Sequence, residues 1–311
     1  MDQKMVLGED VARFGTAEIL EKVSKKNVSP SLVSALTDGC QVQWAFDSFI
    51  GKPVDYQAAN TLGSIFHKIV EDFYALEPED RTRENLKRIT KETVARKEFR
   101  EVKNYRDSLE WIIEAVKGYA RLEPNPENVD VATLNIDGKE RKGLEVFVKG
   151  EIDGVTCLGF VDRVQNSGDD GGVIVEDWKS GKVHRWEGEG ETGWKEQRQQ
   201  IMYSMLLEQY GINVSHARLL YPVFEEIVDV DLHNPELRER VVSDVNKANE
   251  ILEEIKESNE LKYRTDKFFL CGWCPLVKVC PKPKITMRGK VKAAYDSQPS
   301  PEEIHELLTQ D

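Results

Sequence analysis

The chain has 311 residues, of which 40% are hydrophobic and 32% are charged, and its formal net charge is −13. This composition is typical of a globular protein, and no apolar run approaches the ~20 residues of a membrane-spanning helix. The acidic balance argues against a chain that coats nucleic acid indiscriminately, because such binding relies on cations set against phosphates.

The opening residues contain no secretory apolar core, so we expect a cytoplasmic protein in a reducing compartment. In that setting the five cysteines favour metal ligands or core thiols over disulfides. The stretch from Lys278 to Lys292 holds six lysines or arginines and no acidic residue. It is either a contact to a phosphate backbone or a solvated basic tail, and both interpretations stay open.

Helical signals dominate the first part of the chain after an N-terminal extension, residues 1–29. A Ser-Pro pair predicts a short helix over 30–39. Apolar residues spaced three and four apart predict an amphipathic helix over 60–76. Residues 79–122 predict two more helices, ended by prolines, which form an insert covering a sheet.

The middle of the chain holds β-branched runs separated by turn residues, which predict strands. The predicted strands are residues 131–136, 144–149, 151–157, 158–165 and 173–179. A Gly- and Glu-rich loop over 182–193 and a helix over 194–209 follow. Residues 214–231 then read as strand material, and residues 235–262 as a long polar helix.

The last two predicted strands, 158–165 and 173–179, form an antiparallel pair that brings acidic residues into one pocket. Alternation on a strand places Asp162 beside apolar neighbours, and it places Asp177 and Lys179 on a shared face. Burying such ions is costly unless they are paired or bind a cation. The trio therefore indicates either a Mg²⁺ or Mn²⁺ site suited to phosphate chemistry, or a buried ion network that ties the strands together.

The cysteines form a second constellation. Cys271, Cys274 and Cys280 lie within ten residues, which is a strong metal signal. Cys40, in a loop-like aromatic context at a helix end, is the better candidate for the fourth ligand. Cys157, on a strand, is expected to be an inert core thiol. Four thiolates suit either zinc or an iron–sulfur cluster, and spacing alone does not separate the two.

Two further polar residues are ambiguous when each is considered alone. His67 borders the apolar stripe of the helix over 60–76, where a lone histidine is more often a core residue than a ligand. Glu145 either faces the acidic pocket or is an exposed strand glutamate, and the second interpretation is the more common one.

Taken together, four short motifs carry a resemblance. They are Gly63-x-x-x-His67, Gly159-x-x-Asp162, Asp177-x-Lys179 and Gln199-x-x-x-Tyr203, and the cysteines bracket them. In this order they resemble the RecB-family nucleases of the PD-(D/E)XK superfamily. The closer similarity is to its four-cysteine iron–sulfur branch, which includes the CRISPR-associated four-cysteine exonucleases. The resemblance covers residues 30–285.

The resemblance implies an α/β fold with a restriction-endonuclease-like core. In that fold a central mixed β-sheet is flanked by helices, with the helical insert at about 79–122. An iron–sulfur cluster would join the N- and C-terminal parts of the domain, and residues 286–311 would form a C-terminal tail.

Roles for individual residues also follow from the resemblance. His67, Asp162, Asp177 and the backbone carbonyl of Trp178 would bind the catalytic Mg²⁺ or Mn²⁺. Lys179 would be the catalytic lysine, and Gln199 and Tyr203 would line the DNA path. A structural [4Fe-4S] cluster would be held by Cys40, Cys271, Cys274 and Cys280. Glu145 is a secondary candidate, because relatives often carry an acidic residue there.

The implied activity is that of a metal-dependent DNA exonuclease. Such an enzyme would hydrolyse phosphodiester bonds, with single-stranded ends as the expected substrate, in DNA recombination, repair or processing. One alternative is a DNA-end binding or recruitment subunit that works with a helicase or recombination machinery and has little turnover of its own. Another is a zinc-stapled structural protein. No membrane partner is expected, and the oligomeric state is left open.

Overall fold

The computed structural model describes residues 6–7, 11–13, 26–41, 43–45, 58–96, 105–168, 171–181, 183, 193–258 and 260–262. The chain divides into two compact units. One unit comprises residues 1–57 and 244–311, and the other comprises residues 58–243. None of the helices within the described ranges is long and apolar enough to cross a membrane.

The first unit contains a short helix and a small sheet. Helix α2 (Pro30–Val33) begins at Ser29, whose hydroxyl accepts a hydrogen bond from Leu32 N at 3.2 Å. It continues as the π-helical turn η1 (Ser34–Asp38), so the helix predicted over 30–39 is confirmed. Strands β1 (Val6–Leu7), β2 (Val11–Arg13) and β10 (Glu260–Lys262) pair antiparallel in the order β1-β2-β10.

The second unit is built on a mixed five-stranded sheet with the strand order β5-β6-β7-β8-β9. The strands are β5 (Leu144–Ile152), β6 (Val155–Asn166), β7 (Val173–Trp178), β8 (Val214–Tyr221) and β9 (Glu226–Val230). Strand β6 pairs antiparallel with both β5 and β7, β7 and β8 are parallel, and β9 is antiparallel to β8. The antiparallel pairing of β6 and β7 is as predicted.

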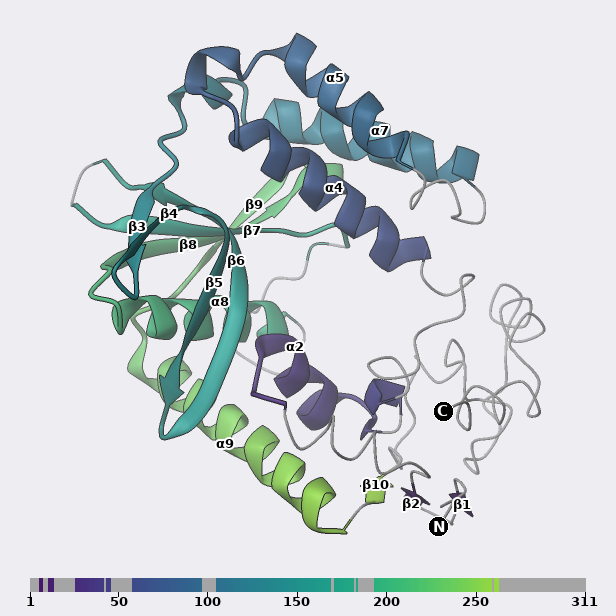
Figure 1. Ribbon diagram of the computed structural model, residues 1–311, viewed down its shortest axis with the longest axis vertical. Coiled ribbons are helices and arrows are strands. Elements are labelled where there is room, and N and C mark those ends of the chain that lie inside the picture. The colour runs from purple at the N-terminus through teal and green to yellow at the C-terminus, as the bar shows by residue number, and fades with distance from the viewer. Residues whose placement is uncertain are drawn as a thin grey trace. The chain divides into compact units, whose positions relative to one another are not determined.

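Helices cover both faces of this sheet (Figure 1). These helices are α4 (Ala58–Tyr74), α7 (Tyr105–Leu122) and α8 (Trp194–Glu208), and α5 (Arg83–Val94) packs on α4. A further helix, α9 (Pro235–Ser258), runs from the second unit into the first. Short 3₁₀ turns are η3 (Pro78–Asp80), η4 (Pro126–Asn128) and η5 (Pro222–Phe224). Helix α8 packs against the sheet on the face opposite α4 and α7 and forms the crossover between the parallel strands β7 and β8. The predicted α/β fold with a mixed sheet between helices is confirmed.

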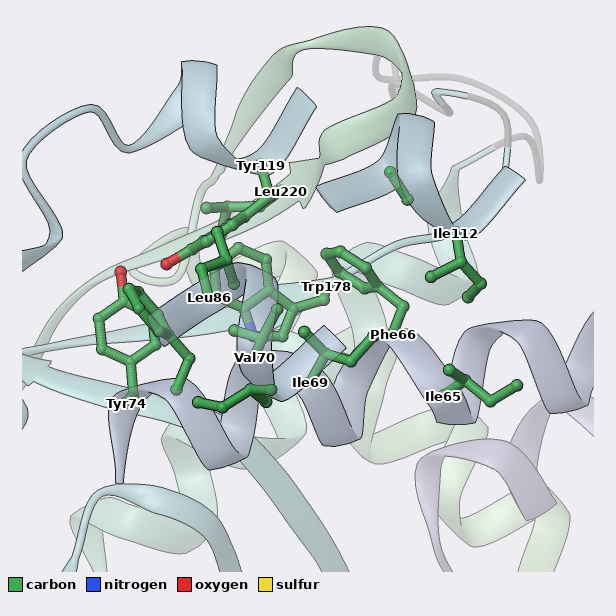
Figure 2. Packing of buried hydrophobic residues seen from close by; sticks show 13 residues of the cluster. Ile65, Phe66, Ile69, Val70, Tyr74, Leu86, Ile112, Tyr119, Trp178 and Leu220 are labelled. Atoms are coloured by element: carbon green, nitrogen blue, oxygen red, sulfur yellow. The ribbon is translucent and has the colours of Figure 1, made fainter. Parts of the chain in front are cut away.

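The hydrophobic core next to the end of β7 is an aromatic-rich cluster between α4, α5, α7 and the sheet (Figure 2). Phe66 of α4 meets Trp178 of β7 edge-on, with ring centroids 6.3 Å apart. Tyr119 of α7 meets the same indole at 5.5 Å. Such edge-to-face pairs add to the free energy gained by burial. They fix the position of α4 over the end of β7, where the functional residues lie.

Several predicted boundaries were wrong. The strands expected over 151–157 and 158–165 form one long strand, β6, because the turn falls at Asp153–Gly154. Both turn residues have positive φ, 48° and 76°, as a tight hairpin requires. The helix expected over 235–262 ends at Ser258 and is followed by β10.

The strand material over 214–231 consists of two strands separated by η5. A hairpin of β3 (Thr133–Ile136) and β4 (Lys139–Lys142) was only half predicted. All four residues of β4 are exposed and charged, so the strand carries no apolar alternation to signal it.

Candidate active site

The site lies where β6 and β7 stop pairing. Their regular register ends at Arg163 opposite Glu176. One residue further on, the side chain of Asp162 continues the connection, because its Oδ2 accepts a hydrogen bond from the backbone N of Trp178 at 2.9 Å. The strands thus part at Asp162 and Asp177, and the Asp162 carboxylate lies in the gap.

Helix α4 adds an imidazole to this point. His67 Nδ1 lies 3.4 Å from Asp162 Oδ2, and His67 Nε2 lies 2.9 Å from the carbonyl oxygen of Trp178. Burial alone would lower the pKa of His67, but the charge and hydrogen bond of Asp162 raise it to about 9. The histidine predicted as a ligand is therefore at the site, together with the Trp178 carbonyl.

Glu145 completes a group of three. One ligand atom each of His67, Glu145 and Asp162 lie within 4.8 Å of one another. Burial, and next the charge of Asp162, raise the pKa of Glu145 to about 7. The common interpretation as an exposed strand glutamate was wrong, since Glu145 is half-buried and faces the acidic pocket.

A backbone irregularity explains how Glu145 reaches the pocket. Its φ is +46°, a left-handed conformation that is rare for a residue with a side chain. The register between β5 and β6 passes from Leu144 opposite Arg163 to Val146 opposite Val161, and skips the pair in between. The skipped pair is Glu145 and Asp162. Strained backbone of this kind concentrates at functional sites.

A second polar group lies behind the first. The Lys179 ammonium is 2.7 Å from Asp177 Oδ2 and donates to Gln199 Oε1, also at 2.7 Å. The Gln199 amide in turn donates to Asp177 Oδ1 at 2.8 Å and to the Tyr203 hydroxyl oxygen at 3.2 Å. Strand β7 and helix α8 are thereby joined through one hydrogen-bonded chain of four side chains.

The charges in this second group are held in place by burial and pairing. Burial raises the pKa of Asp177 to about 6, although Lys179 opposes this shift. Burial by itself would lower the pKa of Lys179, but the charge of Asp177 and their hydrogen bond raise it. The lysine therefore stays an ammonium at neutral pH.

The motif glycines have a steric role. A Cβ at Gly159 would lie 2.5 Å from Cε1 of Tyr203, so only glycine allows α8 to approach β6 this closely. A Cβ at Gly63 would lie 3.2 Å from Ser180 Oγ, which leaves little room where α4 passes the end of β7. Both glycines bring a helix that carries a functional side chain close to the sheet.

A buried ion network was not predicted from the sequence. It lies on the face of the sheet that packs against the aromatic-rich cluster. Arg163, which follows Asp162, donates to Glu176 Oε2 at 2.6 Å and to Glu123 Oε2 at 2.8 Å. Its guanidinium lies 4.4 Å from the ring centroid of Tyr74 and 4.7 Å from that of Trp178. The signal that could have found it is the lone arginine in the apolar strand β6, opposite a glutamate in the apolar strand β7.

The first group suits a hard divalent cation. Two carboxylates and an imidazole provide oxygen and nitrogen ligands. Two of the three residues, His67 and Glu145, line an open cleft of about 590 Å³, which leaves room for water and phosphate. The negative charge of Asp162 raises the pKa of His67 and, after burial, that of Glu145, and a bound cation would neutralise this charge. Asp177, a predicted ligand, lies outside this group of three and is bound by Lys179 and Gln199.

Two of the five cysteines, Cys40 and Cys157, lie within the described residues. Cys157 is fully buried on β6, where burial raises its thiol pKa to about 12, as expected of an inert core thiol. Cys40 follows η1, and its carbonyl accepts a hydrogen bond from Trp44 N at 2.9 Å. Cys271, Cys274 and Cys280 lie outside the described residues, as do the basic stretch from Lys278 to Lys292 and most of the loop over 182–193.

Comparison with known proteins supplies a family. A sequence profile described as the PD-(D/E)XK nuclease superfamily matches residues 27–281. Among solved structures, the chain is similar to a candidate exonuclease from Eubacterium rectale, with 14% sequence identity and a TM-score of 0.47. That match covers 88% of this chain and 95% of the other. A search of curated proteins found no significant match.

Proposed function

The chain belongs to the PD-(D/E)XK nuclease superfamily, and we propose that it is a divalent-metal-dependent DNA exonuclease that acts on single-stranded ends. The observation that carries the proposal is the placement of two polar groups side by side. His67, Glu145 and Asp162 form one group, and the chain from Lys179 through Asp177 and Gln199 forms the other. The first group is suited to binding a metal ion, and the second is suited to holding the Lys179 ammonium next to a phosphate.

The metal would be held by Asp162, Glu145 and His67, with the Trp178 carbonyl and Asp177 as the remaining predicted ligands. When bound, Mg²⁺ or Mn²⁺ polarises a phosphate oxygen and lowers the pKa of coordinated water. The protein orients these ligands through second contacts. The Trp178 N–H holds the Asp162 carboxylate, and the Trp178 carbonyl lies beside the His67 ring.

Lys179 would orient the attacking water and stabilise negative charge that develops on the phosphate. An ammonium has three N–H donors, and within the described part of the chain Asp177 and Gln199 take two of them. The third donor would serve the water or a phosphate oxygen. Gln199 hydrogen-bonds to both Lys179 and Asp177, so it would fix the direction of that donor.

Three finer parts of the proposal rest on the sequence motifs. Single-stranded ends, a role in DNA recombination, repair or processing, and cooperation with a helicase or recombination machinery follow from the RecB-family resemblance. The same holds for a structural [4Fe-4S] cluster on Cys40 and the cysteines at 271, 274 and 280. Four thiolates from both ends of the chain would constrain the unfolded chain and so stabilise the fold.

The test is digestion of end-labelled single-stranded DNA with and without Mg²⁺ or Mn²⁺. We expect metal-dependent release of short products from the native protein and none from Lys179→Ala. The matched control is Lys117→Ala, because Lys117 is an exposed lysine on α7 whose contact is the surface carboxylate of Glu114. Equal activity of native protein and Lys179→Ala would overturn the mechanism.

Strands blocked at the 5′ or 3′ end extend the same assay. Loss of digestion with one block identifies an exonuclease and its polarity, whereas cleavage of doubly blocked strands would contradict exonucleolytic action. Tight binding of ends without metal, combined with negligible turnover in its presence, would favour the DNA-end binding subunit instead.

A further inference from the structure

Two phenylalanines on the β5–β6 hairpin are exposed although the hairpin has a buried side available. Phe160 is 53% exposed and Phe147 is 39% exposed. They face each other across the two strands, with ring centroids 5.2 Å apart and planes inclined at 52°. Single exposed apolar residues are common, but here two aromatic rings present a joint apolar surface to solvent.

The hairpin residues on either side of this pair show which face it occupies. Gly159 and Gly150 face helix α8, since a Cβ at Gly159 would meet Tyr203 and a Cβ at Gly150 would collide with Gln209 at the end of that helix. Phe160 is the strand neighbour of Gly159, so its side chain points to the other face. Phe147 is paired with Phe160 and shares that face.

The metal-ligand group reaches this side of the sheet as well, because α4 packs on the face opposite α8 and its His67 contacts Asp162. Asp162 follows Phe160 by two residues on β6, and Glu145 precedes Phe147 by two residues on β5. Two residues of an extended strand span about 7 Å. This is the scale of one nucleotide, so the aromatic pair lies about one nucleotide from the point where a scissile phosphate would meet the metal ligands.

We propose that Phe147 and Phe160 form a stacking platform for the nucleobase next to the scissile phosphate. The inference deepens the proposed function and rests on it. Aromatic rings bind bases through their π-faces, and every base has one, so the platform would tolerate any sequence. It requires a base that is unpaired and turned out of the stack. A duplex end would have to open first, which gives a physical reason for a preference for single strands.

The platform also offsets a difficulty of the site, which is the clustering of acidic residues around a polyanionic substrate. The bound metal neutralises part of that charge, but stacking provides binding energy that does not depend on charge. Affinity contributed by Phe147 and Phe160 should therefore change little with salt. Phosphate contacts, by contrast, weaken steeply as salt concentration rises.

The experiment measures binding of a labelled oligothymidylate to Lys179→Ala protein in Ca²⁺, so that cleavage does not interfere. Adding Phe160→Ala should weaken binding by about 5- to 150-fold, the range measured for loss of one base–aromatic stack. Phe160→Leu keeps an apolar side chain for the hairpin but removes the ring, and it should show most of the same loss. Phe224→Ala is the matched control, because Phe224 is 46% exposed on η5 and should leave binding unchanged.

An abasic strand provides the second arm. Moving one abasic site along the oligonucleotide should reveal a single position where the missing base weakens binding to the Lys179→Ala protein that retains Phe160. At that position, the added substitution Phe160→Leu should cause no further loss of binding. Undiminished binding by Phe160→Leu, or losses that simply add, would overturn the platform. So would a dimer of the native protein that dissociates on the same substitution while strand binding is unchanged. Cleavage by the otherwise native Phe160→Leu protein shows separately whether the proposed nuclease function holds.

Discussion

Removal of the buried arginine behind the site should destabilise the protein far more than removal of a surface arginine. Arg163 is 0% exposed and its partner Glu176 is 1% exposed. In Arg163→Met the side chain keeps much of its volume, but the buried Glu176 carboxylate loses its closest cation and keeps only the longer contact of 3.8 Å between its Oε1 and Arg218 among the ion pairs of the described residues. Breaking one partner out of a buried pair costs about 3–5 kcal/mol of the free energy of unfolding.

The double variant Arg163→Met/Glu176→Leu should recover part of that loss, because the buried Glu176 charge is removed together with the arginine. Glu123, which is 12% exposed, loses Arg163 but keeps the hydrogen bond from the Tyr74 hydroxyl. Urea unfolding followed by circular dichroism measures the free energy of unfolding of four proteins. These are the native protein, the single variants Arg163→Met and Glu176→Leu, and the double variant. Arg88→Ala is the surface control. Its ion pair with Glu92 is about half exposed on both sides, 51% and 58%, and should contribute less than about 0.5 kcal/mol.

The reasoning fails if Arg163→Met costs no more than Arg88→Ala, or if the double variant is no more stable than the single one. A second readout concerns the site. Arg163 pairs with Glu176 at the last register position before Asp162 and Asp177 diverge. The double variant should therefore fold, but it should cleave DNA more slowly than the native protein, because the pair no longer fixes the strand ends.

Three further predictions concern single positions. Gly159→Ala should destabilise the protein by about 1–3 kcal/mol through overpacking against Tyr203, and Tyr203→Leu in the same chain should relieve the clash, as thermal unfolding would show. In the metal-free protein the pKa of Glu145 is raised from 4.5 to about 7, so its ionisation opposes folding. Raising the pH from about 4.5 to about 7 should then lower the melting temperature relative to Glu145→Gln, and saturating Mn²⁺ should abolish that fall; a difference independent of pH would contradict the shift. Cys40→Ser should reduce the iron content of anaerobically purified protein while Cys157→Ala does not, and a colourless native protein with stoichiometric zinc would argue against the cluster.

Much of the site could be predicted because its residues recur at short fixed spacings. Asp177 and Lys179 are two residues apart at the end of a buried strand, and Gln199 and Tyr203 are four apart on one helix face. Such local spacing predicts which side chains share a direction. The structure brings all four into one hydrogen-bonded chain. Local spacing predicted only that each pair shares a face, and the meeting of the two pairs followed from the family resemblance.

The remainder depended on geometry that no local pattern reports. Glu145 reaches the pocket through a left-handed backbone and a skipped register pair, and neither leaves a trace in residue types. Alternation also breaks after Asp162, since Arg163 and Val164 are both buried. The partners of Arg163 come from another strand and from the end of α7, so only the tertiary fold could identify them.

The most direct test of the central claim is to measure metal binding and cleavage together in Asp162→Asn. Asp162 connects the strand ends and contacts His67, so its loss of charge should abolish both tight Mn²⁺ binding, measured by calorimetry, and release of nucleotides from single-stranded DNA. Asp229→Asn, at a side chain that is 84% exposed, should change neither. Cleavage that persists in Asp162→Asn, or Mn²⁺ binding that is unaffected by it, would contradict the assignment of this centre.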